Sequence, residues 1–227
     1  MSTSVSANLA QVRKRIELAC LAASRPANAV HLLAVSKTMP AQAVRDAYAA
    51  GQVAFGENYI QEGVDKIASL ADLPLEWHCI GPIQSNKTKL VAENFAWVHS
   101  IDRLKIAERL SAQRPANLPA LQICLQVNVD GGSNKSGVAP AELLALAKAV
   151  AVLPHLRLRG IMTIPEPAEN EAAARAVHRQ AKDLFDGLKA AGLNVDTLSM
   201  GMTGDLEAAV AEGSTCVRVG TAIFGQR

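Results

Sequence analysis

The sequence lacks the long apolar segments and the one-sided charge that mark several classes of protein. No stretch reaches eighteen uncharged apolar residues, and the first twenty residues hold no continuous apolar segment, so neither a membrane span nor a secretory signal is indicated. The 23 Lys and Arg residues nearly balance the 21 Asp and Glu residues, without the basic cluster that phosphate neutralisation on nucleic acid needs. We expect a soluble, cytoplasmic protein with neither nucleic acid nor a membrane as partner.

Cysteine is scarce and dispersed. The four cysteines lie far apart, and at least three of them fall in apolar, strand-like segments. This distribution suits reduced, buried thiols better than a disulfide framework or a metal site, so no metal is expected. The four residues are Cys20, Cys79, Cys124 and Cys216.

Apolar residues make up 49% of the chain, enough for a sizeable core. Eight short apolar segments bounded by Gly, Pro, Asn or Asp are typical of strands, and segments with helical spacing alternate with them. Strands and helices that alternate eight times in 227 residues predict an α/β protein with a closed (β/α)₈ barrel, and no GxGxxG motif supports an open dinucleotide-binding sheet. The expected strands are residues 30–37, 53–58, 75–81, 96–102, 121–129, 156–164, 195–201 and 215–225.

The segment before the first expected strand, residues 1–29, has a helical pattern. We expect it to form an extra N-terminal helix that plugs or flanks the barrel. No segment rich in Pro, Gly or Ser divides the chain, so residues 1–227 are predicted to form a single TIM-barrel domain.

Lys37 stands at the end of the first expected strand, where barrels of this kind carry their active sites. A lysine at the rim of an apolar barrel is partly desolvated, which favours the free amine and makes it a nucleophile towards an aldehyde. From the residues alone, this role and a structural ion pair with a carboxylate such as Glu57 have equal weight.

Two clusters of small and polar residues end the last two expected strands. Backbone N–H groups of a glycine-containing turn, two hydroxyls and the N-terminus of the following helix predict an anion site. Loops after the seventh and eighth strands often bind phosphate in this fold, although any single hydroxyl is also explained as a helix cap. The residues concerned are Ser199, Gly201, Met202, Thr203, Gly220 and Thr221.

A phosphate site beside a nucleophilic lysine admits two ligands, a sugar phosphate or pyridoxal 5′-phosphate (PLP). Arg218 helps to choose, because a guanidinium inside an apolar strand needs a nearby acceptor. The pyridine nitrogen of PLP is one such acceptor. The residues favour PLP and leave the sugar phosphate open.

Six motifs resemble, in order and spacing, those of the small pyridoxal phosphate homeostasis proteins, also called the YggS-like group. The resemblance runs from about the first helix to the last few residues. It implies the fold-type III barrel of alanine racemases, with PLP held on Lys37 as an internal aldimine, Arg218 against the pyridine nitrogen and Asn58 near the ring. It also implies that the six residues of the predicted anion site surround the phosphate. The motifs are "LLAVSKTMP", "FGENYIQE", "EWHCIGPIQSNK", "LQVNVDGGSNKSG", "LRGIMTIP" and "LSMGMTGDLEAAVAEGSTCVRVGTAIFG".

Alanine racemases, whose barrel fold the resemblance implies, also use a tyrosine from a further β-domain as a second acid–base group. This sequence has only Tyr48, within an expected helix, and Tyr59, next to Asn58. A permanent cation at the pyridine nitrogen also weakens the ring as an electron sink. We therefore expect a monomer that stores, buffers or delivers PLP without robust catalysis. A low-activity amino-acid racemase and a Schiff-base sugar-phosphate aldolase remain alternatives.

Other polar residues have less specific interpretations. Lys87 and Lys135, in expected loops over the barrel mouth, are candidates to receive PLP that leaves Lys37, although a solvated loop lysine is the stronger interpretation of each. Apo-PLP enzymes are the expected recipients of delivered cofactor. His78 and His99 are interpreted as hydrogen-bonded core residues, and the other three histidines as surface or structural residues; these are His31, His155 and His178.

Overall fold

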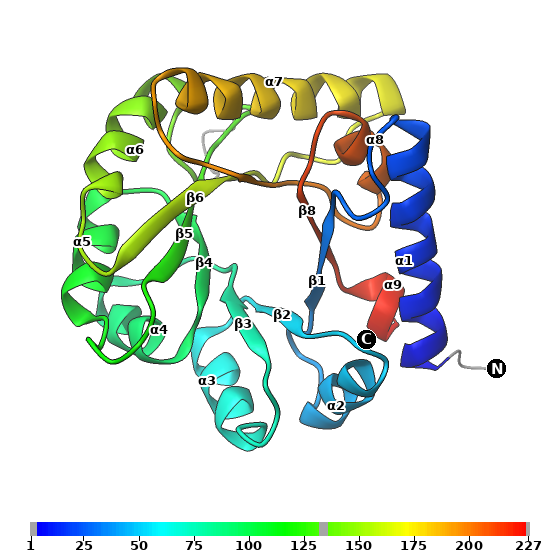
Figure 1. Cartoon of the computed structure of the whole chain (residues 1–227), viewed down its shortest axis with the longest axis horizontal. Helices are drawn as coiled ribbons and strands as arrows, with labels where there is room; N and C mark the ends of the chain where they lie inside the picture. Colours follow the sequence, from blue (N-terminus) through cyan, green and yellow to red (C-terminus); the bar gives the residue numbers. More distant parts are fainter. Residues whose placement is uncertain (1–3, 132–135, 226–227) are drawn as a thin grey trace.

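Eight parallel strands close into a barrel in the computed structural model, which describes residues 4–131 and 136–225 (Figure 1). The strands follow one another around the barrel in chain order, and β8 pairs with β1 to close it. The predicted (β/α)₈ barrel is therefore confirmed. Its strands are β1 His31–Val35, β2 Ala54–Glu57, β3 Glu76–Cys79, β4 Trp97–Ile101, β5 Leu121–Gln126, β6 Leu156–Met162, β7 Thr197–Ser199 and β8 Cys216–Val219.

Helices connect the strands and cover the outside of the barrel (Figure 1). The longest, α7, begins where the side chain of Asn170 accepts the N–H of Ala173 at 2.9 Å, and it buries Phe185 and Leu188. The helices are α1 Val5–Ala22, α2 Ala41–Ala49, α3 Ile60–Ser69, α4 Thr88–Asn94, α5 Leu104–Gln113, α6 Leu143–Ala151, α7 Glu171–Ala190, α8 Leu206–Ala211 and α9 Thr221–Phe224, with 3₁₀ turns η1 Ser85–Lys87 and η2 Pro140–Glu142.

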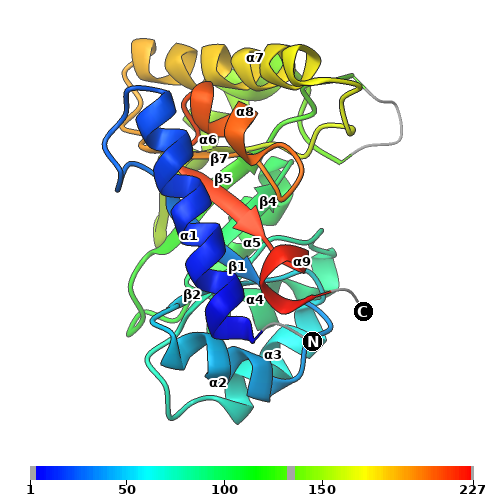
Figure 2. The same cartoon turned by 90° about the vertical axis from the view of Figure 1, so that its right-hand side faces the viewer.

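The predicted N-terminal helix is present as α1, and it flanks the barrel instead of plugging it. Ser4 caps the helix by accepting the N–H of Ala7, and an apolar stripe that includes Leu9 and Ile16 is buried. In Figure 2, α1 runs across the outside of the barrel beside α8 and α9. The amide of Asn8 donates to the carbonyl of Ile223 at 2.9 Å, which fixes α1 to α9.

The expected strands run longer than the observed ones, most of all at the end of the chain. The segment 215–225 was expected to be one strand, but β8 ends at Val219 and the chain then turns at Gly220 into α9. The segment 195–201 is likewise a strand only over Thr197–Ser199. Apolar composition continues past the last ladder hydrogen bond because these turns are also packed against the core.

All four cysteines are buried and free of disulfide bonds, as their spacing predicted. Across the part of the chain that the structure describes, no helix is both long enough and apolar enough to cross a membrane.

Candidate functional site

Lys37 lies two residues beyond the last residue of β1, at the C-terminal end of the barrel. Because β1 pairs with both β2 and β8, this end of β1 lies beside the loop that follows β8. The half-buried Lys37 and that loop line one cavity of about 380 Å³. The structure thus brings Lys37 together with Gly220 and Thr221, which the sequence placed at opposite ends of the chain.

The backbone on both sides of Lys37 is held by a buried ionic cluster. Lys66 Nζ donates to the carbonyl of Ser36 at 2.8 Å and to Glu57 Oε1 at 2.8 Å, and the hydroxyl of Ser36 donates to the same carboxylate oxygen at 2.6 Å. On the other side, the N–H of Thr38 donates to Glu62 Oε1 at 2.5 Å, and Thr38 has a φ of 63°. The peptide groups that flank Lys37 are therefore fixed.

This cluster also answers the alternative interpretation of Lys37. Glu57, the carboxylate considered as its structural partner, pairs with Lys66. Burial raises the pKa of Glu57, against the opposing effect of the hydrogen bonds from Lys66 and Ser36. Lys66 is not among the residues predicted from the sequence, although its position on α3, three residues after Gly63 and six after Ile60, repeats the spacing of the buried face.

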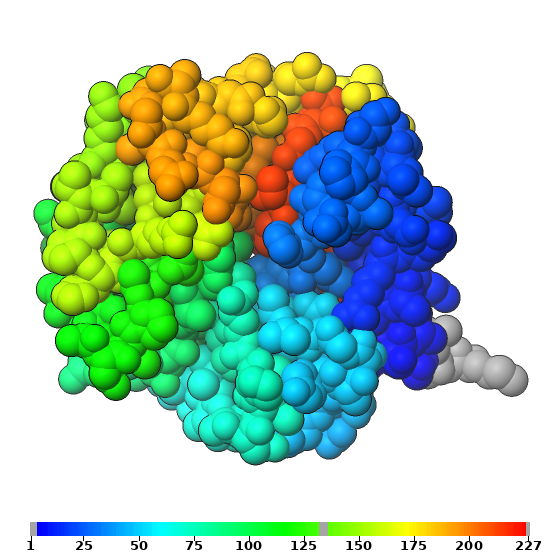
Figure 3. Space-filling model, viewed as in Figure 1, coloured from blue at the N-terminus to red at the C-terminus, as the bar shows by residue number. Residues whose placement is uncertain are grey.

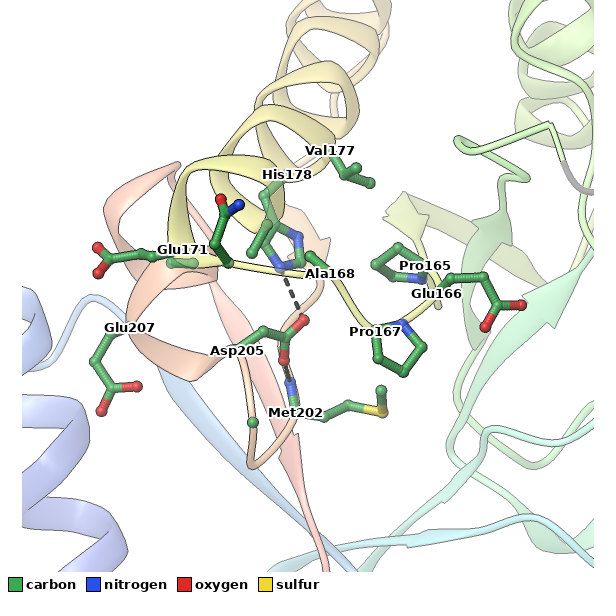
Figure 4. Close-up of a pocket in the computed structure, with 14 residues that line it drawn as sticks. Pro165, Glu166, Pro167, Ala168, Glu171, Val177, His178, Met202, Asp205 and Glu207 are labelled. Carbon is green, nitrogen blue, oxygen red and sulfur yellow. Dashed lines mark hydrogen bonds and ion pairs between the residues drawn. The ribbon is translucent and has the colours of Figure 1, made fainter.

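The turn after β7 takes its shape from Gly201 and Asp205. Gly201 has a φ of 96°, and a Cβ atom at this position would lie 2.5 Å from Cβ of Ala209. Asp205 Oδ1 accepts the N–H of Met202 at 2.6 Å, and Asp205 Oδ2 accepts from Nε2 of His178 at 2.9 Å (Figure 4). The predicted phosphate turn is thus fixed from behind by α7.

Asp205 is charged in this arrangement. Burial acts to raise the pKa of its carboxyl, but the hydrogen bonds from His178 and from the N–H of Met202 outweigh burial and lower it. The turn and the start of α7 border a cavity of about 700 Å³, lined by acidic and apolar residues (Figure 4). His178 is buried beneath it, which agrees with the structural interpretation of this histidine.

Ser199 and Arg218 meet inside the barrel. Arg218 is only 4% exposed; its Nη1 donates to the hydroxyl of Ser199 at 2.8 Å and its Nη2 to the carbonyl of Thr163 at 2.8 Å. The same hydroxyl lies 3.0 Å from Nδ1 of His99. Burial lowers the pKa of Arg218 from its usual high value. Ser199 was predicted to contact phosphate, and its hydroxyl already has two partners within the barrel.

Two side chains near strand ends carry buried oxygens that no other group satisfies. Among the residues that the structure describes, Asn58 Oδ1 and Thr163 Oγ1 are buried without a hydrogen-bond partner. A Cβ atom on Gly81 would lie 2.0 Å from the carbonyl oxygen of Asn58, so the loop after β3 packs directly on it. Asn58 is a predicted site residue and Thr163 is not, although Thr163 directly follows β6 within the motif "LRGIMTIP".

The remaining candidate residues either do not line the cavity beside Lys37 or lie outside the described residues. Tyr59 is 55% exposed, and Tyr48 is half-buried on α2. Lys87 is half-buried in the turn η1. Lys135 lies outside the described residues.

Known proteins match this chain over nearly its whole length. The family described as "Alanine racemase, N-terminal domain" matches residues 7–227. The pyridoxal phosphate homeostasis protein of Pseudomonas aeruginosa is 60% identical over 100% of this chain and 97% of its own length. The protein of the same name from Escherichia coli K12 is 54% identical over 98% of this chain and 97% of its own length. The chain belongs to the pyridoxal phosphate homeostasis protein family.

Solved structures agree with this family. The Synechococcus elongatus protein PipY, solved with PLP bound, is 40% identical and covers 98% of this chain and 100% of its own, with a TM-score of 0.86. The alanine racemase of Corynebacterium glutamicum is 17% identical, with a TM-score of 0.71; the match covers 98% of this chain and 61% of that enzyme. At that identity the racemase shares the fold, and the fold alone.

Proposed function

We propose that this protein holds PLP covalently on Lys37 and stores, buffers or delivers it in the cytoplasm. The observation that carries the proposal is the cavity in which Lys37 faces Gly220 and Thr221. The relatives named for PLP homeostasis and the PLP-bound structure of PipY support PLP as the ligand. The domain that does this is residues 1–227 as a single unit.

The residues of the cavity fit the cofactor. A Cβ atom on Gly220 would lie 3.1 Å from the carbonyl oxygen of Val35, so a larger residue would crowd the cavity beside Lys37. The buried oxygens of Asn58 and Thr163 offer hydrogen-bond partners at the ends of β2 and β6. Arg218 supplies a buried cation that donates to the carbonyl of Thr163 at the end of β6.

PLP, when bound, supplies an aldehyde carbon that takes up a primary amine with loss of one water. Lys37 provides that amine. Its side chain enters the cavity while the cluster of Glu57, Lys66 and Glu62 holds the peptides of Ser36 and Thr38 in place. The uncharged amine is the form that attacks.

The phosphate is assigned to the two turns that follow β7 and β8. Backbone N–H groups in glycine-containing turns form anion sites, and Asp205 keeps the first turn in shape through Met202. The residues proposed to surround the phosphate are Ser199, Gly201, Met202, Thr203, Gly220 and Thr221.

The same site supports holding PLP better than using it. Arg218 donates hydrogen bonds and remains cationic, so it gives the pyridine nitrogen a donor without protonating it. Of the described residues that line the cavity, Lys37 alone has a side chain that titrates. We therefore propose a monomeric carrier, with apo-PLP enzymes as recipients.

Titration with PLP tests the proposal. We expect the wild-type protein to develop a visible absorption band that borohydride removes, and Lys37→Ala to develop none. The matched control Lys89→Ala, which changes an exposed lysine on α4, should behave as wild type. Full PLP affinity in Lys37→Ala would refute the covalent role. Exchange of the α-hydrogen of alanine for deuterium at an enzyme-like rate would favour the racemase, and borohydride trapping of a sugar phosphate by a colourless protein would favour the aldolase.

Delivery is tested separately from storage. The loaded protein is mixed with an apo-PLP enzyme, and reactivation is compared with that given by free PLP at the same concentration. If reactivation is faster than the release of PLP into solution allows, guided delivery is supported. Reactivation no faster than release leaves storage and excludes delivery.

A further inference from the structure

A line of polar side chains crosses the barrel interior, where most (β/α)₈ barrels pack branched apolar residues. It begins at Glu76, the first residue of β3, whose carboxylate lies 2.9 Å from Nε2 of His78. Nδ1 of His78 lies 2.9 Å from Nε2 of His99, and Nδ1 of His99 lies 3.0 Å from the hydroxyl of Ser199. The line ends at Arg218, which donates to that hydroxyl.

The two end residues of this hydrogen-bond chain set the direction in which its hydrogen bonds are donated. A carboxylate only accepts hydrogen bonds and a guanidinium only donates them. His78 therefore donates from Nε2 to Glu76 and, as a neutral imidazole, accepts at Nδ1 from Nε2 of His99. His99 then accepts at Nδ1 from the hydroxyl of Ser199, which accepts from Arg218. Every hydrogen bond points from Arg218 towards Glu76, and each imidazole is neutral with its proton on Nε2.

The electrostatics of the buried groups agree with that protonation pattern. Burial lowers the pKa of His78, against the opposing effect of its hydrogen bond to Glu76. Burial, together with the neighbouring His78 and Arg218, lowers the pKa of His99 far below its usual value. The hydrogen bond from His78 lowers the pKa of Glu76, so the accepting end stays ionised.

The line of side chains runs from the N-terminal face of the barrel into its interior. Figure 3 shows the face at the N-terminal ends of the strands, where a cavity of about 820 Å³ is lined by Glu76, His78 and Trp97 among other residues. The Glu76 side chain is 47% exposed there, and the ring of His78 stacks on Trp97 at 5.2 Å. Arg218, at the other end, belongs to the proposed cofactor site.

We propose that Glu76, His78 and His99 are positioning residues that act through Ser199 to fix the orientation of Arg218 towards the cofactor ring. This inference rests on the proposed function, because it takes Arg218 to face bound PLP. A guanidinium has five N–H donors, and two of them are taken up inside the barrel, one by the hydroxyl of Ser199 and one by the carbonyl of Thr163. The hydrogen-bond chain fixes the bond from Arg218 to Ser199 in one direction. The remaining N–H donors of Arg218 therefore keep one orientation.

The decisive variants lie far from the cofactor. Glu76→Gln replaces the accepting carboxylate by an amide that both donates and accepts, which removes the direction of the chain. We expect PLP affinity to fall on the order of tenfold, the effect of one hydrogen bond to a charged group. With ¹⁵N-labelled histidine, His78 and His99 should show a proton only on Nε2 in the wild type and a mixture of tautomers in Glu76→Gln. Glu108→Gln, the same change on the exposed face of α5, serves as the control.

A second pair of variants separates positioning from packing. Glutamine at position 78 donates and accepts like a neutral imidazole, whereas leucine fills the space and does neither. We expect His78→Gln to retain PLP affinity and His78→Leu to lose it, even where both have the thermal stability of the wild type. Equal PLP affinity in the two variants, or wild-type affinity and wild-type tautomers in Glu76→Gln, overturns the inference. A wild-type protein without the visible band refutes the proposed function instead, and the tautomers of the cofactor-free protein still decide the direction of the chain.

Discussion

Lys66→Met removes the cation from a buried ion pair and replaces it by an apolar chain of similar length. The side chain of Lys66 is 6% exposed and that of Glu57 is fully buried, so neither charge is compensated by solvent. Lys66 Nζ also bonds Glu62 at 3.0 Å and the carbonyl of Ser36. Its loss leaves the Glu57 carboxylate with the hydroxyl of Ser36 as its remaining donor.

Breaking a buried pair by removing one partner costs about 3 to 5 kcal/mol, because an uncompensated charge stays behind. We expect about 3 kcal/mol at pH 8, since Ser36 still donates to the carboxylate. Burial already raises the pKa of Glu57, and loss of Lys66 raises it further. Protonated Glu57 favours the folded state; that contribution is complete below the unfolded pKa and is lost as pH rises through the folded pKa. The destabilisation by Lys66→Met is therefore smaller at pH 5 than at pH 8.

Urea unfolding of the wild type, Lys66→Met, Glu57→Gln and the double variant measures both effects at the two pH values. We expect the destabilisation of the double variant to be smaller than the sum of those of the single variants. Lys66→Met leaves the Glu57 carboxylate without its cation, and Glu57→Gln removes that negative charge. A Lys66→Met protein as stable as the wild type at pH 8, or an equal deficit at both pH values, would contradict this account. The cluster would then be packing without net electrostatic stabilisation.

Two further predictions concern the turn after β7. Asp205→Asn weakens the hold on the N–H of Met202, so we expect PLP affinity to fall about tenfold while affinity for pyridoxal, which lacks the phosphate, is unchanged; equal losses for both ligands would show that the turn does not serve the phosphate. Gly201→Ala places a Cβ atom 2.5 Å from Cβ of Ala209 at a positive φ, so we expect about 2 to 3 kcal/mol of destabilisation in urea. Gly204→Ala is its control, because a Cβ atom there meets nothing within 4 Å; equal stability of the two variants would refute the steric argument.

The order of the elements and the cavity around Lys37 could be predicted from the sequence, because both depend on local pattern and on the closure rule of parallel barrels. Strand ends could not, since apolar composition does not show where ladder hydrogen bonds stop. The partners of buried polar groups also escaped prediction. The contact between His99 and Ser199 depends on the register of four strands, and the register of β4 with β5 shifts between Val98 and Ile101. Lys66 was not predicted because charged residues are rarely buried. Its partners depend on how α3 packs against the barrel.

The pairing of β1 with β8 has a consequence for synthesis on the ribosome. The strand that leads to Lys37 leaves the exit tunnel early, whereas the strand that leads to Gly220 and Thr221 leaves last. The apolar stripe of α1 likewise stays uncovered until α8 and α9 have been synthesised. A nascent or prematurely terminated chain thus has Lys37 without the opposing turn, so the site proposed for PLP is not yet closed.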